Sequence, residues 1–422
     1  MESAAPDAAS LNRALVKQLK DMGVIQSASV EAAFRAVPRH LFVPSAPLDK
    51  VYRDEVIVTK QSQTGAPISS CEQPAIVAVM LEQLGLEPGQ NVLEIGAGTG
   101  HVAALLAHIV GKAGRVTTMD IQPDVAEAAR EHLAGAGLSE VNVVCSDGGF
   151  GYAEAAPYDR IILTVGSSDI APAWQEQLRV GGRLVLPLYL MPGVQESVAF
   201  GKTATSLESL SLQPCGFMPL QGSFAAERPH EVQLGTEPGL TFSLDHEGTV
   251  DAQAVYALLT GPSRDLGTDI TVTARELVSG LGPWITLNES HSCGLGARKS
   301  WLSGDRVPLV LGQGDQFGST GGLIDGTERL ALLARPPDRP LPEKLPAKEP
   351  PIPLRVISYG PDDALAERLI QQVQAWDKAR RPMIDQARIT AYPRGANLSP
   401  SAGDYVLVKP SVQFVVRWEA SG

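Results

Sequence analysis

The sequence predicts an α/β protein built around a parallel, doubly wound sheet, and two observations lead to this fold class. Helix-like and strand-like segments alternate between residues 73 and 190, as they do where parallel strands are joined by crossover helices. The chain has 422 residues, of which 44% are hydrophobic and 19% charged. It is therefore long and apolar enough to bury about two or three domain cores.

The first residues predict helices. Leu11, Leu15 and Leu19 recur every four residues, which places them on one helical face. Ser29 is suited to cap a second helix. The stretch RAVPRHLFVP, punctuated by prolines, then ends the helical part. We predict an N-terminal helical segment over residues 1–45.

The alternating region follows, and we assign residues 46–205 to it as one domain. Pro74 suits the first turn of a helix and Gly85 its C-terminal cap. Strands are expected at 91–98, 115–121, 141–148 and 158–165, helices at 73–85, 99–110 and 123–137, and a helix, turn and strand over 174–188.

The pattern changes after residue 205. Short strand-like stretches at 239–244 and 268–274 stand between glycine-rich turns, with one helix-like stretch at 251–261. This mixture favours an α+β extension over residues 206–334. A proline-rich linker is expected at 335–353.

The last segment, residues 354–422, predicts a C-terminal subdomain. Within it, Leu365, Leu369, Val373 and Trp376 follow a helical spacing. Because the opposite face of this helix is polar, we expect the apolar face to pack on another element.

Charge and composition exclude several classes of partner. The formal net charge is −12 and no basic stripe is present, which disfavours nucleic acid and anionic membranes. The N-terminus lacks a signal-peptide pattern, no apolar run is long enough to cross a bilayer, and the histidines show no ligand spacing. We expect a cytoplasmic protein with no nucleic acid, membrane or metal partner.

A glycine-rich turn carries the first functional signal. The stretch LEIGAGTGH (93–101) follows a predicted strand and opens a helix. Gly96, Gly98 and Gly100 allow the backbone to approach a ligand, and the helix beyond presents unpaired N–H groups. A purely structural turn is the alternative explanation.

Two acids at the ends of the following strands strengthen this signal. Asp120 lies 20 residues after Gly100, where a carboxylate can accept hydrogen bonds from both ribose hydroxyls. Asp147 ends the third strand and suits the exocyclic amine of an adenine. Taken singly, Asp120 could instead cap a helix and Asp147 could form a turn.

The turn also distinguishes between nucleotides. Its pattern is G-x-G-x-G rather than the G-x-G-x-x-G of dinucleotide-binding proteins, and no P-loop lysine follows. Glu94 would repel a pyrophosphate but not the cationic end of S-adenosylmethionine. We therefore predict S-adenosylmethionine as cofactor, with S-adenosylhomocysteine as its product.

The motifs around these residues resemble those of protein-L-isoaspartate O-methyltransferases. In chain order they are VPRHLFVP (37–44), VYRDE (51–55), the Gln-Pro helix (63–80), VLEIGAGTG (92–100), SDGGFG (146–151), APYDRIILT (156–164) and QLRVGGRLVLP (177–187). The resemblance covers about residues 30–190. It implies a Rossmann-like S-adenosylmethionine-dependent methyltransferase fold with N-terminal helices and an α+β C-terminal extension.

The same resemblance implies a set of site residues. Cofactor contacts are expected at Glu94, Gly96, Gly98, Gly100, His101, Asp120, Ile121, Asp147 and Gly148, and substrate contacts between Ser69 and Gln73. The sequence departs from the family pattern twice. Glu72 stands directly before Gln-Pro, where repair enzymes usually have a hydroxyl residue, and His101 replaces a commonly aromatic residue.

In its length, the chain resembles a subgroup of these enzymes that is associated with ribosomally made peptides such as lanthipeptides and graspetides. The shared features are GAPISS–QPAIVAVMLEQL, PCGFMPLQGSFA (214–225) and AWDKARRP (375–382). Members of this subgroup methylate an aspartate in a modified peptide, and the ester then collapses to an aspartimide or isoaspartate.

The chemistry gives the stretch PISSCEQP a role. A carboxylate is ionised at neutral pH and needs no general base to attack a sulfonium methyl. Ser69 and Ser70 are expected to orient the substrate carboxylate, and Gln73 to donate to a peptide carbonyl. Glu72 would repel an anion, so it either points away or favours a substrate with a cationic neighbour. Alternatively, SSCE only caps the following helix.

We predict a carboxyl O-methyltransferase that acts on an aspartate of a ribosomally made, modified peptide. The alternative is a general protein-L-isoaspartate O-methyltransferase that repairs aged proteins. In both cases the partner is a peptide or protein carrying Asp or isoAsp. A non-catalytic binding module and a methyltransferase for RNA or small molecules are more distant rivals.

Overall fold

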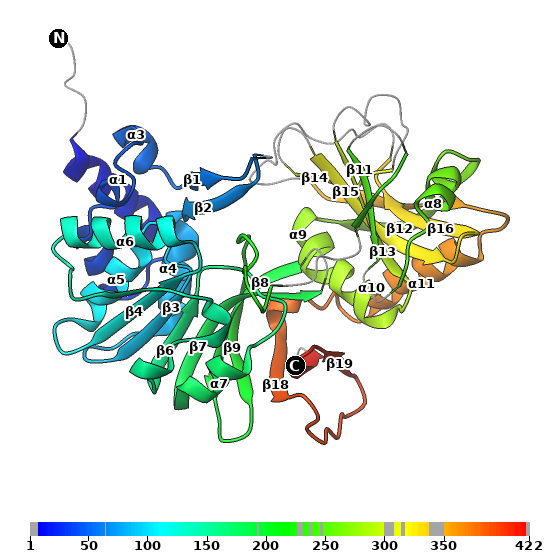
Figure 1. The fold of residues 1–422 in the computed structure, drawn as a ribbon. Coiled ribbons are helices and arrows are strands. Elements are labelled where there is room, and N and C mark those ends of the chain that lie inside the picture. The colour runs from blue at the N-terminus through cyan, green and yellow to red at the C-terminus, as the bar shows by residue number, and fades with distance from the viewer. Residues whose placement is uncertain are drawn as a thin grey trace, which may run out of the picture. The chain divides into compact units, whose positions relative to one another are not determined.

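The computed structural model describes residues 7–63, 65–191, 194–225, 231–235, 239–244, 248–298, 308–313, 317–336 and 350–418. The chain forms two compact units. Unit 1 comprises residues 1–190, 195–226 and 388–417, and unit 2 comprises residues 191–194, 227–387 and 418–422. Figure 1 shows the elements of both units. The division of the chain into five segments, which the sequence pattern suggested, remains a prediction.

Unit 1 begins with helices, as expected. They are α1 (Ala8–Asp21), α2 (Ala28–Ala36), the 3-10 helix η1 (Arg39–Phe42) and α3 (Leu48–Val51). The predicted cap of the second helix is wrong, because Ser27 rather than Ser29 accepts a hydrogen bond from the N–H of Val30. Ser29 lies inside the first turn, whereas Ser27 directly precedes it.

The predicted parallel sheet is confirmed. Its strands are β3 (Asn91–Ile95), β4 (Arg115–Asp120), β5 (Asn142–Cys145), β6 (Tyr158–Leu163) and β7 (Leu178–Met191), in the order β7-β6-β3-β4-β5 with parallel pairing throughout. Helix α4 (Pro74–Leu84) precedes β3. The helices between the strands are α5 (His101–Val110), α6 (Pro123–Gly135) and α7 (Pro172–Gln177), with short 3-10 turns η2 (Gly148–Phe150) and η3 (Ala153–Ala155). In Figure 1, α5 packs against β3 and β4, and α6 against β4 and β5.

Five further strands extend the same sheet beyond β7. They are β8 (Val194–Lys202), β9 (Leu207–Pro214), β18 (Ala387–Pro393), β20 (Val412–Trp418) and β19 (Asp404–Val408), in that order. β9 pairs with β18 in an antiparallel register that places Thr390 opposite Glu208. Residues near the C-terminus therefore complete the sheet of unit 1. A separate antiparallel hairpin, β1 (Ile57–Gln61) and β2 (Pro67–Cys71), precedes α4.

Unit 2 is built on one eight-stranded sheet. Its strands are β10 (Glu231–Gln233), β11 (Leu240–Leu244), β12 (Ser263–Val272), β13 (Ser292–Arg298), β14 (Leu311–Gln313), β15 (Phe317–Asp325), β16 (Arg329–Ala334) and β17 (Ile352–Tyr359). Its helices are α8 (Ala252–Leu259), α9 (Ala274–Glu276), the π-helical η4 (Leu277–Leu281), α10 (Gly282–Asn288), α11 (Ala364–Lys378) and the 3-10 turn η6 (Ile384–Gln386).

Both faces of this second sheet are buried. On β16, Ala331 and Leu333 belong to one apolar cluster, and Leu330 and Leu332 to another, as the twofold alternation of a strand requires. Helix α11 packs against β12, β15, β16 and β17. The four apolar residues at helical spacing that predicted this helix are all buried. Most of the predicted proline-rich linker at 335–353 lies outside the described residues.

In the part of the chain that the structure describes, no helix is both long and apolar enough to cross a membrane.

Candidate active site

The glycine turn joins β3 to α5 and has the backbone that its glycines predict. Gly96, Gly98 and Gly100 have φ values of +103°, +50° and +85°, a region that other residues rarely adopt. The Thr164 hydroxyl donates to the carbonyl of Gly96 at 2.6 Å. A Cβ on Gly96 would lie only 2.7 Å from that hydroxyl oxygen. The turn is therefore fixed in a shape that requires glycine.

Glu94 is a buried acid just before this turn. Its Oε2 accepts a hydrogen bond from the Thr118 hydroxyl at 2.6 Å, whereas its Oε1 is buried without a hydrogen-bond partner. Burial raises the pKa of Glu94 well above its ordinary value, and the nearby carboxyls of Glu72 and Asp120 add to the increase. The orphaned oxygen is an acceptor suited to a cationic or N–H donor.

Asp120 lies at the end of β4 against the glycine turn. Its carboxylate accepts from the N–H of Gly98 at 3.1 Å and from that of Gln122 at 3.0 Å. Burial raises the pKa of Asp120, and these N–H groups oppose the increase only in part. The structure therefore places Asp120, the predicted contact of the ribose hydroxyls, directly beside the predicted glycine turn.

Asp147, the predicted adenine contact, is held by backbone groups. Its Oδ1 accepts from Gly149 N at 2.9 Å and its Oδ2 from Ser223 N at 2.7 Å. Burial raises the pKa of Asp147, but these two N–H groups together with the Ser223 side chain outweigh burial and lower it. Since each carboxylate oxygen can accept a second bond, an adenine contact remains compatible with this geometry.

The other predicted cofactor contacts have varied environments. His101 is buried and its ring lies 5.3 Å from that of Phe42. Burial lowers the pKa of His101 to about 3, so its imidazole is neutral at physiological pH. Gly148 packs on Ile95, where a Cβ would lie 2.4 Å from Cγ2 of that side chain. Ile121 follows directly after β4 and is half-buried.

The predicted substrate residues lie at the junction of β2 and α4. Ser69 and Ser70 are both 6% exposed, and the Ser69 hydroxyl accepts from that of Thr59 at 3.2 Å. The Gln73 amide donates to Asp54 Oδ2 at 2.9 Å, and Asp54 Oδ1 accepts from the N–H of Ala75 at 2.8 Å. The alternative that SSCE only caps α4 is wrong, because Asp54 supplies the cap.

A pocket of about 210 Å³ opens at this junction. Its lining includes Ser70, Glu72, Gln73 and Thr164, with apolar side chains of the β1–β2 hairpin and the loop at 214–218. Ser69 does not line it. A Cβ on Gly98 would lie 3.0 Å from the carbonyl oxygen of Ser70. The pocket and the glycine turn are therefore direct neighbours.

Arg39 is a buried residue that holds this region together through hydrogen bonds. It is 2% exposed, and its guanidinium donates to backbone carbonyls from α3 to the start of α4, namely those of Val51, Arg53, Glu55, Cys71 and Glu72. It thus ties the β1–β2 hairpin and its preceding loop to η1.

Arg39, Asp54 and Thr164 are not among the residues that the sequence pattern predicted for the site. Each stands in a stretch quoted for its resemblance, VPRHLFVP, VYRDE and APYDRIILT respectively. Charged residues within these short stretches, such as Arg39 and Asp54, could therefore have been recognised as candidate site residues. What each one bonds depends on elements distant in sequence, and the sequence pattern does not show this.

Comparison with known proteins assigns the family. The profile of protein-L-isoaspartate(D-aspartate) O-methyltransferases matches residues 9–225. This chain belongs to the protein-L-isoaspartate O-methyltransferase family. The resemblance found in its motifs is confirmed, and so are the Rossmann-like methyltransferase fold and S-adenosylmethionine as the cofactor of the family.

A relative of similar sequence agrees with this assignment. The chain is 39% identical over 208 residues to a protein-L-isoaspartate O-methyltransferase of Ignicoccus hospitalis, covering 49% of this chain and 96% of the relative. A solved protein-L-isoaspartate O-methyltransferase is 23% identical, with a TM-score of 0.49, covering 90% of this chain and 96% of that one. A Plasmodium falciparum protein solved with S-adenosylhomocysteine is 17% identical, with a TM-score of 0.44, covering 50% and 98%.

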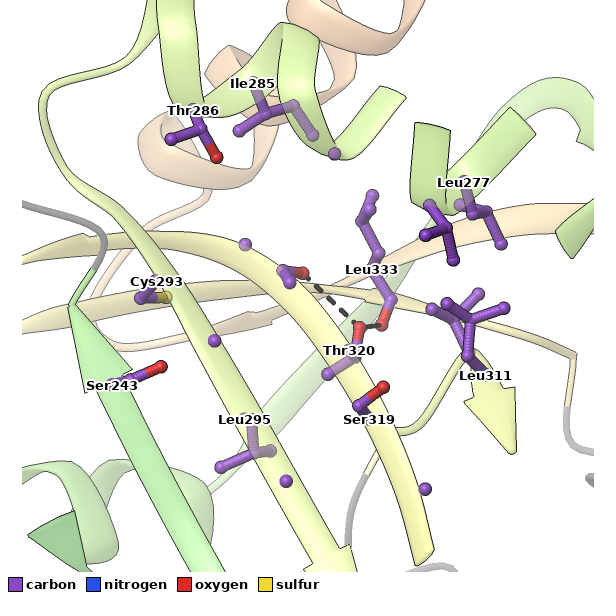
Figure 2. Close-up of a pocket in the computed structure, with 18 of the residues that line it drawn as sticks. Ser243, Leu277, Ile285, Thr286, Cys293, Leu295, Leu311, Ser319, Thr320 and Leu333 are labelled. Carbon is purple, nitrogen blue, oxygen red and sulfur yellow. Dashed lines mark hydrogen bonds between the residues drawn. The ribbon is translucent and has the colours of Figure 1, made fainter. Parts of the chain in front are cut away.

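A cavity larger than the pocket at the β2–α4 junction lies in unit 2. It measures about 460 Å³ and is lined by β11, β13 and β15 on one side and by η4 and α10 on another. Figure 2 shows Ile285 and Thr286 of α10 over the strands that carry Cys293 and Thr320. None of the residues predicted to bind cofactor or substrate lines it. All of those residues belong to unit 1.

Proposed function

We propose that unit 1 transfers a methyl group from S-adenosylmethionine to the carboxylate of an isoaspartyl residue in proteins and peptides. The observation that carries this proposal is the contact between the glycine turn and the β2–α4 junction. The carbonyl of Ser70 lies next to Gly98, so a cofactor held by the turn and a carboxylate held in the pocket would be neighbours.

The residues present fit a cationic cofactor. Glu94 and Asp120 flank the glycine turn, and burial raises the pKa of each. A ligand carrying a sulfonium and an ammonium group would favour the ionised form of such acids. Glu94 would meet the cationic end and Asp120 the ribose hydroxyls. When bound, S-adenosylmethionine supplies an electrophilic methyl group.

The protein contributes position rather than a base. The acceptor carboxylate is ionised at neutral pH, so the site has to hold it in line with the methyl group. Orientation of this kind can lower a barrier by roughly 7 kcal/mol or more. Ser70 and Gln73 line the pocket and carry donors for the carboxylate and for a peptide carbonyl.

The direct test is turnover with a linear peptide that contains one isoaspartyl residue. The full chain is incubated with S-adenosylmethionine, and S-adenosylhomocysteine is measured because the methyl ester can decay. We expect turnover with the isoaspartyl peptide and far less with the same peptide containing Asp. Equal turnover of both peptides, or of neither, would contradict the proposal.

A narrower function remains as a second candidate, namely tailoring of an aspartate in a ribosomally made, modified peptide. It is favoured by unit 2, which lies mostly outside the family match and contains a cavity. The names of the relatives favour the general isoaspartyl substrate. A constrained cyclic Asp peptide that turns over faster than the linear isoaspartyl peptide would reverse this order.

A further inference from the structure

Glu72 has a position that the proposed function does not yet explain. It lines the pocket of unit 1 together with Ser70, Gln73 and Thr164. Its Oε1 lies 3.7 Å from the point that a Cβ on Gly98 would occupy. The carboxyl group therefore stands between the glycine turn and the pocket.

The charges around Glu72 are mainly negative. Glu94 on β3 and Asp120 on β4 both interact with it electrostatically. The neighbouring cation is Arg39 on η1, but its guanidinium donates to the carbonyl oxygen of Glu72 at 2.7 Å. Asp54 is engaged with Gln73 and the N–H of Ala75.

This environment favours the neutral acid. Burial raises the pKa of Glu72 to about 7, with Arg39 acting against the increase and Asp120 adding to it. A substrate carboxylate has an ordinary pKa near 4. When two carboxyl groups approach each other they hold one proton between them, and it resides on the group with the higher pKa.

We propose that Glu72 binds the substrate as a neutral carboxylic acid and donates its O–H to one oxygen of the acceptor carboxylate. The inference rests on the proposed function of the pocket. The proton stays on Glu72 throughout, so the acceptor remains an anion and its free oxygen remains nucleophilic. Glu72 thus supplies a hydrogen-bond donor to the acceptor carboxylate, but only while it is protonated.

The first test measures protons rather than turnover. The full chain with excess S-adenosylhomocysteine is titrated with a linear isoaspartyl peptide, acetylated at its N-terminus and free of histidine, at about pH 7.5. Calorimetry in two buffers of different ionisation enthalpy gives the proton count. We expect a net uptake of up to about one proton per peptide. Glu72→Gln should abolish the uptake, whereas Glu131→Gln, on the exposed face of α6, should retain it.

The second test is the pH profile of kcat/KM at saturating cofactor, followed through S-adenosylhomocysteine. For the parent chain we expect a decline approaching tenfold per pH unit well above about pH 7. Glu72→Gln and Glu72→Ser carry donors that do not titrate there, so both should lose this decline. The Glu131→Gln control should keep the parental slope.

The outcomes of these tests distinguish the role of Glu72 from the proposed function of the pocket. Methyl transfer with a flat parental profile and no proton uptake would overturn the role of Glu72 and leave the function standing. A rise of kcat/KM with pH would also overturn it, because it would mean that an ionised Glu72 attracts a cationic neighbour in the substrate. Absence of peptide binding and of turnover at every pH would remove the proposed function, and this inference with it.

Discussion

Asp120 shows how one side chain can serve both the fold and the ligand. Its carboxylate accepts the N–H groups of Gly98 and Gln122 and so fixes the turn and the start of α6. The same carboxylate is the predicted ribose contact. An acid that the protein already holds with two donors loses little freedom when a ligand binds to it.

We expect Asp120→Ala to weaken S-adenosylmethionine binding by about 1–3 kcal/mol, the usual effect of losing hydrogen bonds to a charged group. Isothermal titration calorimetry on the full chain measures this. Glu127→Ala, which removes an exposed carboxylate on α6, is the control and should bind as the parent does. Unchanged affinity in Asp120→Ala would remove this residue from the cofactor site.

The protonation of Glu94 makes the stability of the folded, cofactor-free protein depend on pH. Its pKa is raised in the folded state, so between its ordinary value and the raised one the folded chain holds a proton that the unfolded chain releases. The stability that this proton contributes is present at acidic pH and is lost as the pH rises. A buried acid without a cationic partner therefore destabilises the cofactor-free protein at neutral pH.

Glu94→Gln should remove this loss. We expect the melting temperature of the cofactor-free variant to fall less than that of the parent between about pH 5 and pH 8, by a few degrees. Differential scanning calorimetry of the parent and of the variant, at both pH values, measures this difference. At the same time the variant should bind S-adenosylmethionine more weakly, since a neutral amide cannot attract the cation. A parallel fall in both proteins would show that Glu94 does not titrate in this range.

At the scale of elements, the β1–β2 hairpin depends on Arg39. One buried guanidinium donates to carbonyls before, within and after this hairpin, namely those of Val51, Cys71 and Glu72. Carbonyls that point inward need a donor, and arginine offers five N–H groups in a fixed fork. The wall of the pocket is therefore held by a side chain outside it.

We expect Arg39→Ala to destabilise the full chain by about 3 kcal/mol or more, because several buried carbonyls lose their donor. Arg53→Ala removes only an exposed ion pair with Asp49, and should cost less than about 1 kcal/mol. Urea unfolding of both variants gives the comparison. If the two costs were equal, the carbonyl network would contribute nothing to stability.

At the scale of the whole molecule, the C-terminal strands belong to the core of unit 1. Ile389, Phe414 and Val416 are fully buried, and the Ile389 N–H donates to the Ser209 hydroxyl at 2.8 Å. The family match ends at residue 225. The sheet of this chain therefore continues with strands that lie more than 160 residues later in the sequence.

Phe414→Ala should accordingly cost about 3–5 kcal/mol, as for other fully buried aromatic side chains. Val408→Ala, on the neighbouring strand β19, changes a side chain that is 55% exposed, and should lie within about 0.5 kcal/mol of the parent. Chemical unfolding measures both free energies. A small cost for Phe414→Ala would mean that these strands fold independently of the core.

The residue pattern alone predicted the parallel sheet, the glycine turn and the cofactor, and the resemblance of the motifs predicted the family. The sheet and the turn follow from short-range signals, because helix and strand periodicity, caps such as Pro74 and Gly85, and closely spaced glycines act within a few residues. The spacing from Gly100 to Asp120 works for the same reason, since one helix and one strand separate them.

Only the tertiary structure decided what the chain places around that site. It joined Asp54 to the start of α4, tied the hairpin to Arg39 and brought β18 beside β9. It also set Glu72 between the turn and the pocket, where burial among other acids changes its protonation. These outcomes depend on contacts between distant segments and on desolvation, which exist only once the chain has folded.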